Sequence, residues 1–210
     1  LALLLSLYGV PIARQAALKY GIVDAPDGRL KHQREPVPYF GGLAIFIKKS
    51  FVVNRVDNVV IFPELNTTEN ENDDGYFSMG RNLQILEFDS SEKIFTILNF
   101  HGMWVAKGKV DTDKRILQSK KVKEIFDKVK GAVVLCTDLN VVPDTKSLTI
   151  LTEGNRDLIK ENKINSTRSS LKSRSEVVDY VIVSPAVEVK DFKVLQNQVS
   201  DHLPLMLEFT

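Results

Sequence analysis

The stretch Val133–Asn140 constrains the fold of this chain more than any other, because it joins a buried strand to two polar side chains. Its first four residues, Val133–Cys136, are apolar, and Asp138 and Asn140 follow before Pro143 closes the loop. Such a run is typical of a strand covered on both faces of a sheet. Open α/β sheets bind their ligands at the carboxyl ends of strands. We therefore expect Asp138 and Asn140 at a functional edge of a sheet.

Three further predicted strands carry a polar side chain at one end, of a kind suited to metal, phosphate or proton chemistry. His101 follows Ile94–Phe100, Asp179 begins Asp179–Val183, and Asp201 and His202 precede Leu203–Phe209.

Composition limits the class of protein without defining a function. The 210 residues suit one domain with an appendage, and 43% hydrophobic with 26% charged residues allows a sizeable core. A net charge of +1 neither indicates nor excludes a nucleic-acid partner. Cys136 is the single cysteine, so no intrachain disulfide can form, and a buried thiol fits a reducing, cytoplasmic location. Nothing in the sequence indicates an obligate protein partner.

A helix over Asp111–Lys130 is the strongest helical prediction. Asp111, Thr112 and Asp113 supply the N-cap and an acidic first turn, apolar residues recur at near 3.6 spacing, and Gly131 ends the helix. We interpret the basic residues between 107 and 130 as a solvated helix face.

The other predicted elements give an α/β order in which a helix crosses between strands of one sheet. Strands are expected at Leu43–Ile47, Phe51–Phe62, Arg81–Phe88, Lys93–Phe100, Val177–Ser184, Val187–Leu195 and Leu203–Phe209, short helices at Lys146–Leu151 and Arg156–Glu161, and a polar loop at Asn165–Ser175. We expect Trp104 and Tyr180 to be packing residues.

The N-terminal region differs from the rest of the chain in composition. Leu1–Ala13 is apolar but shorter than the ~20 residues that cross a bilayer, and it lacks the features of a signal peptide, so we expect at most a weak membrane association. A basic loop rich in Gly and Pro follows over Gly21–Gly42.

That loop resembles the first cytoplasmic loop of the polyprenyl-phosphate sugar-1-phosphate transferases, through Gly21-Ile22-Val23-Asp24-x-Pro26-Asp27-x-Arg29-x-x-His32 and then Pro36-x-Pro38-x-x-Gly41-Gly42. These are magnesium-dependent integral membrane enzymes. The resemblance covers roughly residues 1–46 and includes none of their later catalytic loops. One alternative therefore stays open, namely that the chain is a fragment of such a transferase.

A second resemblance covers about Gly42–Thr210. It consists of four motifs in the order and spacing of the endonuclease/exonuclease/phosphatase family, which is the deoxyribonuclease I-like superfamily. They are Leu98-Asn99-Phe100-His101-Gly102, Thr137-Asp138-Leu139-Asn140, Asp179-Tyr180-Val181 and Ser200-Asp201-His202-Leu203-Pro204. The resemblance implies an α/β fold, namely a partial two-sheet αββα sandwich over residues 43–210, preceded by an apolar helix and basic loop over residues 1–42.

The resemblance also implies a chemistry. Hydrolysis of a phosphodiester needs an activated water and neutralisation of charge on the phosphoryl oxygens. His202 would be the catalytic histidine, Asp179 would orient it and stabilise its charge, and Asp138 would position the water. The expected activity is that of a metal-dependent phosphoesterase or phosphodiesterase.

The remaining roles concern the phosphate and the metal. Asn140 and His101 would contact the scissile phosphate, and Arg81 is either a phosphate clamp or a plain solvated side chain. Asp201, together with Asp138, would bind Mg²⁺, with Mn²⁺ as the alternative ion. The substrate is a phosphate ester, and nucleic acid, inositol phosphate and phospholipid stay open.

Two departures from the family pattern matter. The usual Gly-Asp-Phe-Asn is Thr137-Asp138-Leu139-Asn140 here, and residues 1–42 contain no counterpart of the family's opening strands or of the glutamate that is its principal metal ligand. Glu35 lies in a Pro-flanked loop and does not replace it. We therefore expect two partial genes joined near Gly41-Gly42, whether as a natural fusion or an artefact, and a site impaired in its metal half. An inactive phosphate-binding remnant is the further alternative.

Overall fold

The computed structural model describes residues 23–24, 37–38, 51–62, 81–90, 93–105, 108–172, 175–197 and 200–210. The chain divides into two units, Leu1–Phe46 and Ile47–Thr210. Within the first unit, β1 (Val23–Asp24) pairs antiparallel with β2 (Val37–Pro38). The predicted apolar helix over Leu1–Ala13, most of the basic loop, the junction at Gly41-Gly42 and the strand Leu43–Ile47 lie outside the described residues.

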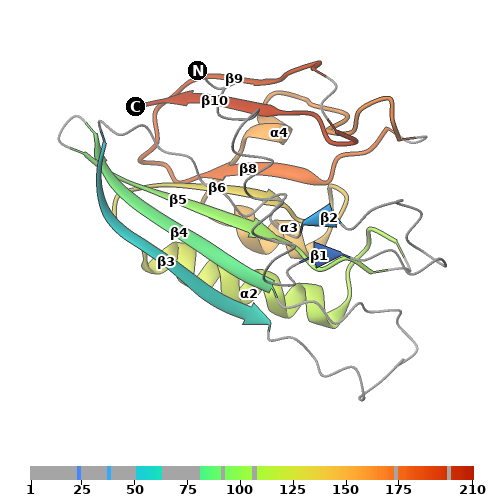
Figure 1. The fold of residues 1–210 in the computed structure, drawn as a ribbon, viewed down its shortest axis with the longest axis horizontal. Coiled ribbons are helices and arrows are strands. Elements are labelled where there is room, and N and C mark those ends of the chain that lie inside the picture. The colour runs from blue at the N-terminus through green and yellow to red at the C-terminus, as the bar shows by residue number, and fades with distance from the viewer. Residues whose placement is uncertain are drawn as a thin grey trace. The chain divides into compact units, whose positions relative to one another are not determined.

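The second unit is built on a mixed six-stranded sheet with the strand order β3-β4-β5-β6-β8-β7 (Figure 1). Only the β5–β6 pair is parallel among these neighbours, and the other pairs are antiparallel. The strands are β3 (Val52–Phe62), β4 (Arg81–Ser90), β5 (Lys93–His101), β6 (Ala132–Asp138), β7 (Arg156–Asp157) and β8 (Asp179–Val183).

A separate two-stranded antiparallel sheet consists of β9 (Val189–Val194) and β10 (Leu205–Phe209). It faces the large sheet, because the ring of Phe209 contacts that of Phe95 on β5 edge to face, at 5.3 Å between centroids. The mixed α/β class and the arrangement of two facing sheets predicted from the sequence are thereby confirmed.

The parallel β5–β6 pair requires a crossover, and helix α2 (Asp113–Lys128) provides it. Val122 and Phe126 are buried where α2 packs on the sheet. Thr112 is the N-cap, since its side chain accepts a hydrogen bond from the backbone N–H of Arg115. The predicted helix is confirmed, although it begins at Asp113 rather than at Asp111.

Asp111 caps a different helix. Its carboxylate accepts hydrogen bonds from the backbone N–H groups of Lys146 and Ser147, at the start of α3 (Lys146–Thr152). The sequence also predicted a helix over Arg156–Glu161, but its first two residues form β7, and α4 (Leu158–Glu161) begins after Asp157 caps it. No helix in the described part of the chain has the length and hydropathy needed to cross a membrane.

The strand β6 lies at the centre of the core. Val133, Val134 and Leu135 are each at most 1% exposed, which agrees with a strand covered on both faces. The predicted solvated face between residues 107 and 130 is wrong at Arg115, which is fully buried. Its guanidinium donates hydrogen bonds to backbone carbonyls of the loop that leads from β5 to α2, those of Met103, Gly108 and Val110.

Candidate active site

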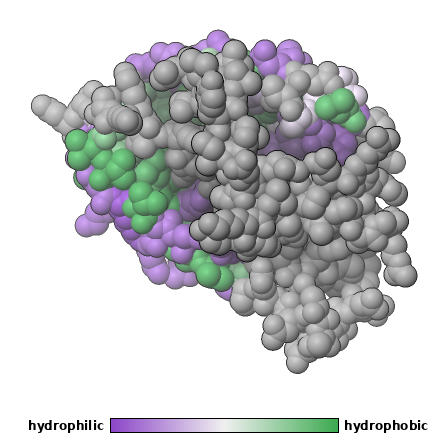
Figure 2. All heavy atoms as spheres, in the orientation of Figure 1, coloured by the Kyte–Doolittle hydropathy of each residue, from purple (hydrophilic) through white to green (hydrophobic). Residues whose placement is uncertain are grey.

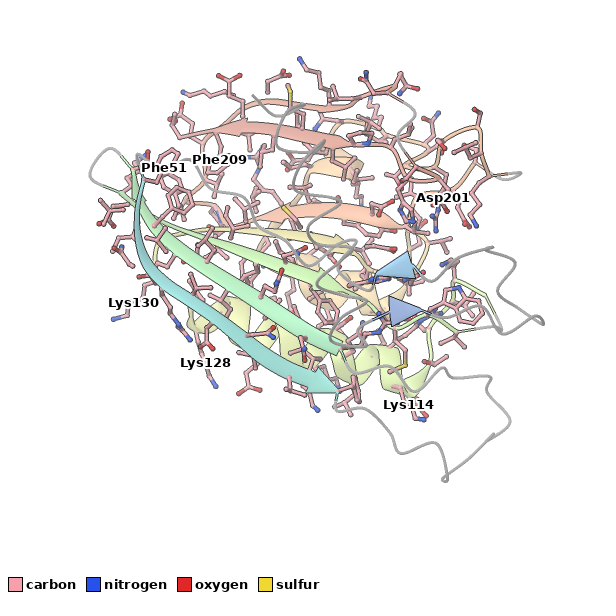
Figure 3. All side chains as sticks on the ribbon, viewed as in Figure 1. Phe51, Lys114, Lys128, Lys130, Asp201 and Phe209 are labelled. Carbon is pink, nitrogen blue, oxygen red and sulfur yellow. The ribbon has the colours of Figure 1, made fainter. Side chains whose placement is uncertain are left out.

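The register of the large sheet places three polar side chains in one row. His101 ends β5 and pairs with Asp138 at the end of parallel β6, and Asp138 pairs with Asp179 at the start of antiparallel β8. Adjacent strands are about 4.8 Å apart, so these side chains lie within reach of one another. The strand ends that carry the row lie on the side of Figure 3 where Asp201 is labelled, away from the side where Phe209 of β10 is labelled.

Gly102 allows the ends of β5 and β6 to approach closely. Its backbone N–H donates a hydrogen bond to the carbonyl of Asp138 at 2.7 Å. A Cβ atom at Gly102 would lie 2.4 Å from the carbonyl oxygen of Leu139, closer than any side chain tolerates. The glycine of the His101-Gly102 motif is therefore explained by backbone packing that brings His101 beside Asp138.

His202 enters the row from the loop before β10. Its Nδ1 lies 2.8 Å and 2.9 Å from the two carboxylate oxygens of Asp179. Thr167 donates its hydroxyl proton to Asp179 Oδ2 at 2.6 Å and accepts hydrogen bonds from the backbone N–H groups of Val178 and Asp179. Because the carboxylate accepts the Nδ1 proton, the neutral imidazole carries its lone pair on Nε2.

The pKa of His202 lies above its ordinary value of 6.5. Burial alone would lower the pKa, but the hydrogen bond and the charge of Asp179, together with the charge of Asp138, outweigh it. Nε2 of His202 is 3.7 Å from Asp138 Oδ2. This imidazole can therefore take up and release a proton near neutral pH.

His101 differs from His202 in its protonation. Desolvation lowers the pKa of His101 to about 4, and the charges of Arg81 and His202 contribute. Half of the His101 side chain is exposed. His101 is neutral near pH 7, and its Nε2 lies 3.5 Å from Asp138 Oδ2.

Asp138 is the carboxylate between the two histidines. Burial raises its pKa, the charge of Asp179 raises it further, and His202 and Lys109 lower it. Its Oδ1 accepts a hydrogen bond from the backbone N–H of Asn140 at 3.0 Å. Two carboxylates this close repel each other, and a bound cation or a protonated His202 relieves the repulsion.

Asn140 is held in a left-handed backbone conformation, with φ at 58°, and is 2% exposed. Its amide nitrogen donates a hydrogen bond to the carbonyl of Gly102 at 3.3 Å, and its amide oxygen accepts one from the ammonium of Lys109. A non-glycine residue in this conformation costs free energy that the surrounding hydrogen bonds must offset. This backbone conformation holds the amide of Asn140 in the lining of the pocket.

These side chains line one open pocket of about 440 Å³. Six of the seven predicted site residues line it, and the seventh, Asp179, holds His202 from behind. The lining residues are Arg81, His101, Trp104, Lys109, Asp138, Asn140, Arg168, Lys172, Glu176, Asp201 and His202. A larger pocket of about 680 Å³, lined by residues of α3, β7, α4 and the loops beside them, contains none of the predicted site residues.

Four cationic side chains reach the pocket, and sequence reasoning had singled out only Arg81. Arg81 is nearly buried at the first position of β4 and Lys109 precedes α2, while Arg168 and Lys172 come from the predicted polar loop. Desolvation lowers the pKa of both Arg81 and Lys109, and Asp138 partly opposes this in each. The pocket is therefore suited to an anion.

Arg168 is one of the site residues that the sequence did not reveal. Its guanidinium is buried, donates a hydrogen bond to Asp201 Oδ2 at 3.0 Å, and contacts Nε2 of His202 through the same Nη1. A backbone bridge between Arg168 and His202 holds the two loops together. Nothing in the Ser-rich string around Arg168 distinguishes it from a solvated arginine, because its burial depends on strands far away in the sequence.

A three-residue group can hold a metal ion, namely Asp138, Asp179 and His202, whose ligand atoms lie within 4.8 Å of one another. The two carboxylates fit a hard cation, which prefers oxygen ligands. The predicted ligand Asp201 is placed differently. Its carboxylate accepts a hydrogen bond from Arg168 and lies 3.4 Å from the ammonium of Lys172, so two cations already balance its charge.

No protein-family model and no curated protein sequence matches the chain. Solved structures match its fold. A mannosyl-6-phosphatase of Bacteroides thetaiotaomicron has a TM-score of 0.56 at 19% identity, over 76% of this chain and 67% of that one. An endonuclease/exonuclease/phosphatase of Bacteroides vulgatus has a TM-score of 0.55 at 18% identity, over 92% and 78%. TDP2 of D. rerio, solved with a single-strand DNA product, has a TM-score of 0.57 at 14% identity, over 76% and 68%.

Proposed function

Because the chain has the fold of the endonuclease/exonuclease/phosphatase proteins, we propose that it is a phosphoesterase whose reaction takes place in the pocket around His202 and Asp138. One observation carries the proposal. The imidazole of His202 is held at Nδ1 by Asp179 while Nε2 faces Asp138 in a pocket with four cationic side chains. This combination suits proton transfer beside a bound anion.

The anion is best explained as a phosphate group. Buried guanidinium nitrogens favour planar, bidentate recognition of phosphate oxygens. The Nε atoms of Arg81 and Arg168 are buried and have no hydrogen-bond partner within the described residues, and that of Arg168 lies 3.9 Å from the Glu176 carboxylate. A phosphate in the pocket would accept hydrogen bonds from these cations and from Lys109, and would offset their desolvation.

His202 would act on the proton of the attacking water or of the phosphate. Asp179 fixes the tautomer in which Nδ1 carries the proton, and it stabilises the imidazolium that forms when Nε2 takes up a second one. Asp138 lies 3.7 Å from Nε2, at a distance where one carboxylate oxygen can orient a water molecule. Neutral His101 and the amide of Asn140 would complete the contacts to the phosphoryl group.

Mg²⁺ is the metal we propose, with the carboxylates of Asp138 and Asp179 as the ligands that the described residues offer. The ion would supply a positive charge next to the phosphoryl oxygens. We expect its affinity to be low, because Asp179 is also engaged by His202 and Thr167, and Asp201 by two cations.

The substrate class stays at the level of a phosphate ester. The comparison proteins include a mannosyl-6-phosphatase and TDP2, which was solved with a DNA product. The alternative of a membrane transferase fragment is not favoured, since the larger unit has the fold of phosphatases and nucleases.

The test is hydrolysis of a chromogenic phosphate monoester and of a chromogenic diester, each with Mg²⁺, with Mn²⁺ and with EDTA. His202→Ala should lower the rate about 10²- to 10⁴-fold, the range for loss of a general acid or base. His32→Ala removes a histidine of the other unit and serves as the matched control. Hydrolysis that His202→Ala leaves unchanged would refute the assignment, and so would the absence of hydrolysis of either ester with every metal.

A further inference from the structure

The outer strand of the large sheet, β3, is exposed along most of its length. Val52, Val56 and Val60 are 64%, 76% and 61% exposed, and within the described residues β3 pairs only with β4. Figure 2 shows hydrophobic residues, in green, at the left margin of the view, where Figure 1 draws β3. An edge strand of this length with exposed valines is a template for pairing with another strand.

The sequence of β3 is complementary to itself. Residues Val52–Val60 read Val-Val-Asn-Arg-Val-Asp-Asn-Val-Val, which is the same from both ends except that Arg55 exchanges with Asp57. In an antiparallel pair related by a two-fold axis at Val56, every valine lies opposite a valine and every asparagine opposite an asparagine. The one pair that differs between the two reading directions is also complementary, because Arg55 then lies opposite Asp57 of the other strand.

We propose that β3 pairs antiparallel with β3 of a second copy of this chain, about a two-fold axis at Val56. The two large sheets then form one continuous sheet across the dimer. The pairing uses, in both copies, the edge of β3 that has no partner strand within the described residues, so the contact is isologous and closes at two subunits. It lies on the second unit alone and does not depend on the proposed enzymatic activity.

The charges at the centre select this arrangement over its competitors. Arg55 and Asp57 are about half exposed, and within one strand their side chains form an ion pair at 2.6 Å. Across the two-fold axis they make two further opposite-charge pairs, which are favourable in cross-strand positions. Parallel pairing in register would instead place Arg55 opposite Arg55 and Asp57 opposite Asp57, which is unfavourable.

A β-bulge sets the extent of regular pairing. The register between β3 and β4 shifts between Val53 and Arg55 and again between Val60 and Phe62, and bulges of this kind bend and twist an edge strand. The central segment Arg55–Asp57 lies beyond that shift and carries the two-fold contact. We therefore expect a dimer whose population depends on concentration and on ionic strength.

The test uses complementary charge changes and sedimentation equilibrium of the full chain. Arg55→Asp places Asp opposite Asp in the homodimer, and Asp57→Arg places Arg opposite Arg, so each should weaken dimerisation about tenfold or more at low salt. An equimolar mixture of these two variants restores opposite charges at both pairs and should form a heterodimer. The double variant carrying both changes should recover the homodimer of the unchanged protein.

Glu124→Lys is the control, because it changes another exposed ion pair, with Lys128, on the surface of α2. It should leave dimerisation unchanged, and circular dichroism should show that all variants are folded. A monomer at the highest concentration attainable would overturn the proposal. Open-ended assembly would also overturn it, as would a dimer that the charge changes at β3 do not weaken.

Discussion

The guanidinium of Arg168 contacts Nε2 of His202, the imidazole whose Nδ1 is held by Asp179. A guanidinium can only donate, so this contact belongs to the neutral imidazole, and protonation of Nε2 requires the arginine to withdraw. The raised pKa of His202 and the arginine contact therefore oppose each other. A phosphate that binds Arg168 would free Nε2 for proton transfer.

Arg168→Lys should weaken substrate binding more than it slows the chemical step. Lysine keeps the charge but loses the planar fork, which is not a conservative change at a site for phosphate. We expect KM to rise by about tenfold while kcat changes less, a loss of about 1.4 kcal/mol. Steady-state kinetics measures the split, and thermal unfolding controls for the buried position. An unchanged KM would exclude Arg168 from substrate binding.

Asp179→Asn should lower kcat by about 10³-fold or more, because an amide does not hold the imidazole in the required tautomer. Asp191→Asn, at an exposed carboxylate paired with Lys193, is the matched control. Equal activity of the two variants would remove Asp179 from the mechanism. Thr167→Val removes the hydroxyl that donates a hydrogen bond to Asp179, and it should lower kcat by a smaller factor.

The pH dependence should follow His202. Because its pKa in the folded protein lies above 6.5, the rate that requires a neutral Nε2 should rise with pH through that raised pKa. Asp179→Asn removes the hydrogen bond and the charge that raise the pKa, so the titration of His202 followed by NMR should move to lower pH.

Stability changes in the opposite sense with pH. The folded protein binds the His202 proton more tightly than the unfolded chain does. Its contribution to the free energy of unfolding is therefore complete below the unfolded pKa of 6.5, and it is lost as pH rises through the folded pKa. Denaturant unfolding of the protein and of His202→Gln at several pH values measures this difference. A difference that grows with pH would contradict the raised pKa.

Gly102→Ala should destabilise the protein by steric conflict with the backbone of Leu139, by about 3 kcal/mol. Gly154→Ala is an informative control. Its Cβ would meet no atom within 4 Å, but its φ of +72° strains an alanine, for a cost of about 1 kcal/mol. Urea unfolding measures both free energies. If Gly102→Ala costs no more than Gly154→Ala, the close approach of β5 and β6 is looser than described.

Mg²⁺ should bind weakly, with a Kd of about 1 mM or above, since two carboxylates are few for a hard cation. Asp138→Asn should abolish the binding measured by calorimetry. Binding in the micromolar range, or binding that survives Asp138→Asn, would show that ligands other than this group hold the ion.

Much of the second unit follows from local sequence. The apolar run Val133–Leu135 predicted a strand covered on both faces, and the capped pattern after Thr112 predicted α2. Both predictions depend only on residues that are close together in the sequence. Tyr180 is a packing residue as expected, with its hydroxyl bonded to the carbonyl of Val141. Trp104 lines the pocket instead, which its sequence neighbours did not indicate.

The meeting of His101, Asp138 and Asp179 could be anticipated because each stands at a strand end, and position at a strand end is readable from the sequence. The burial of Arg115 and of Arg168 could not be anticipated from the sequence. Each arginine is held by segments that are distant in sequence or irregular in structure, which the residues beside it in the chain do not reveal. The functions of the predicted site residues stay predictions.

The row His101–Asp138–Asp179 depends on strand register. A slip of β6 by a single residue would turn Asp138 to the opposite face of the sheet and present Thr137 or Leu139 to the histidines. Misfolded chains would thus be catalytically silent even when their secondary structure is intact. In a refolding experiment, the rate of hydrolysis would then report the fraction of molecules whose β6 has the correct register.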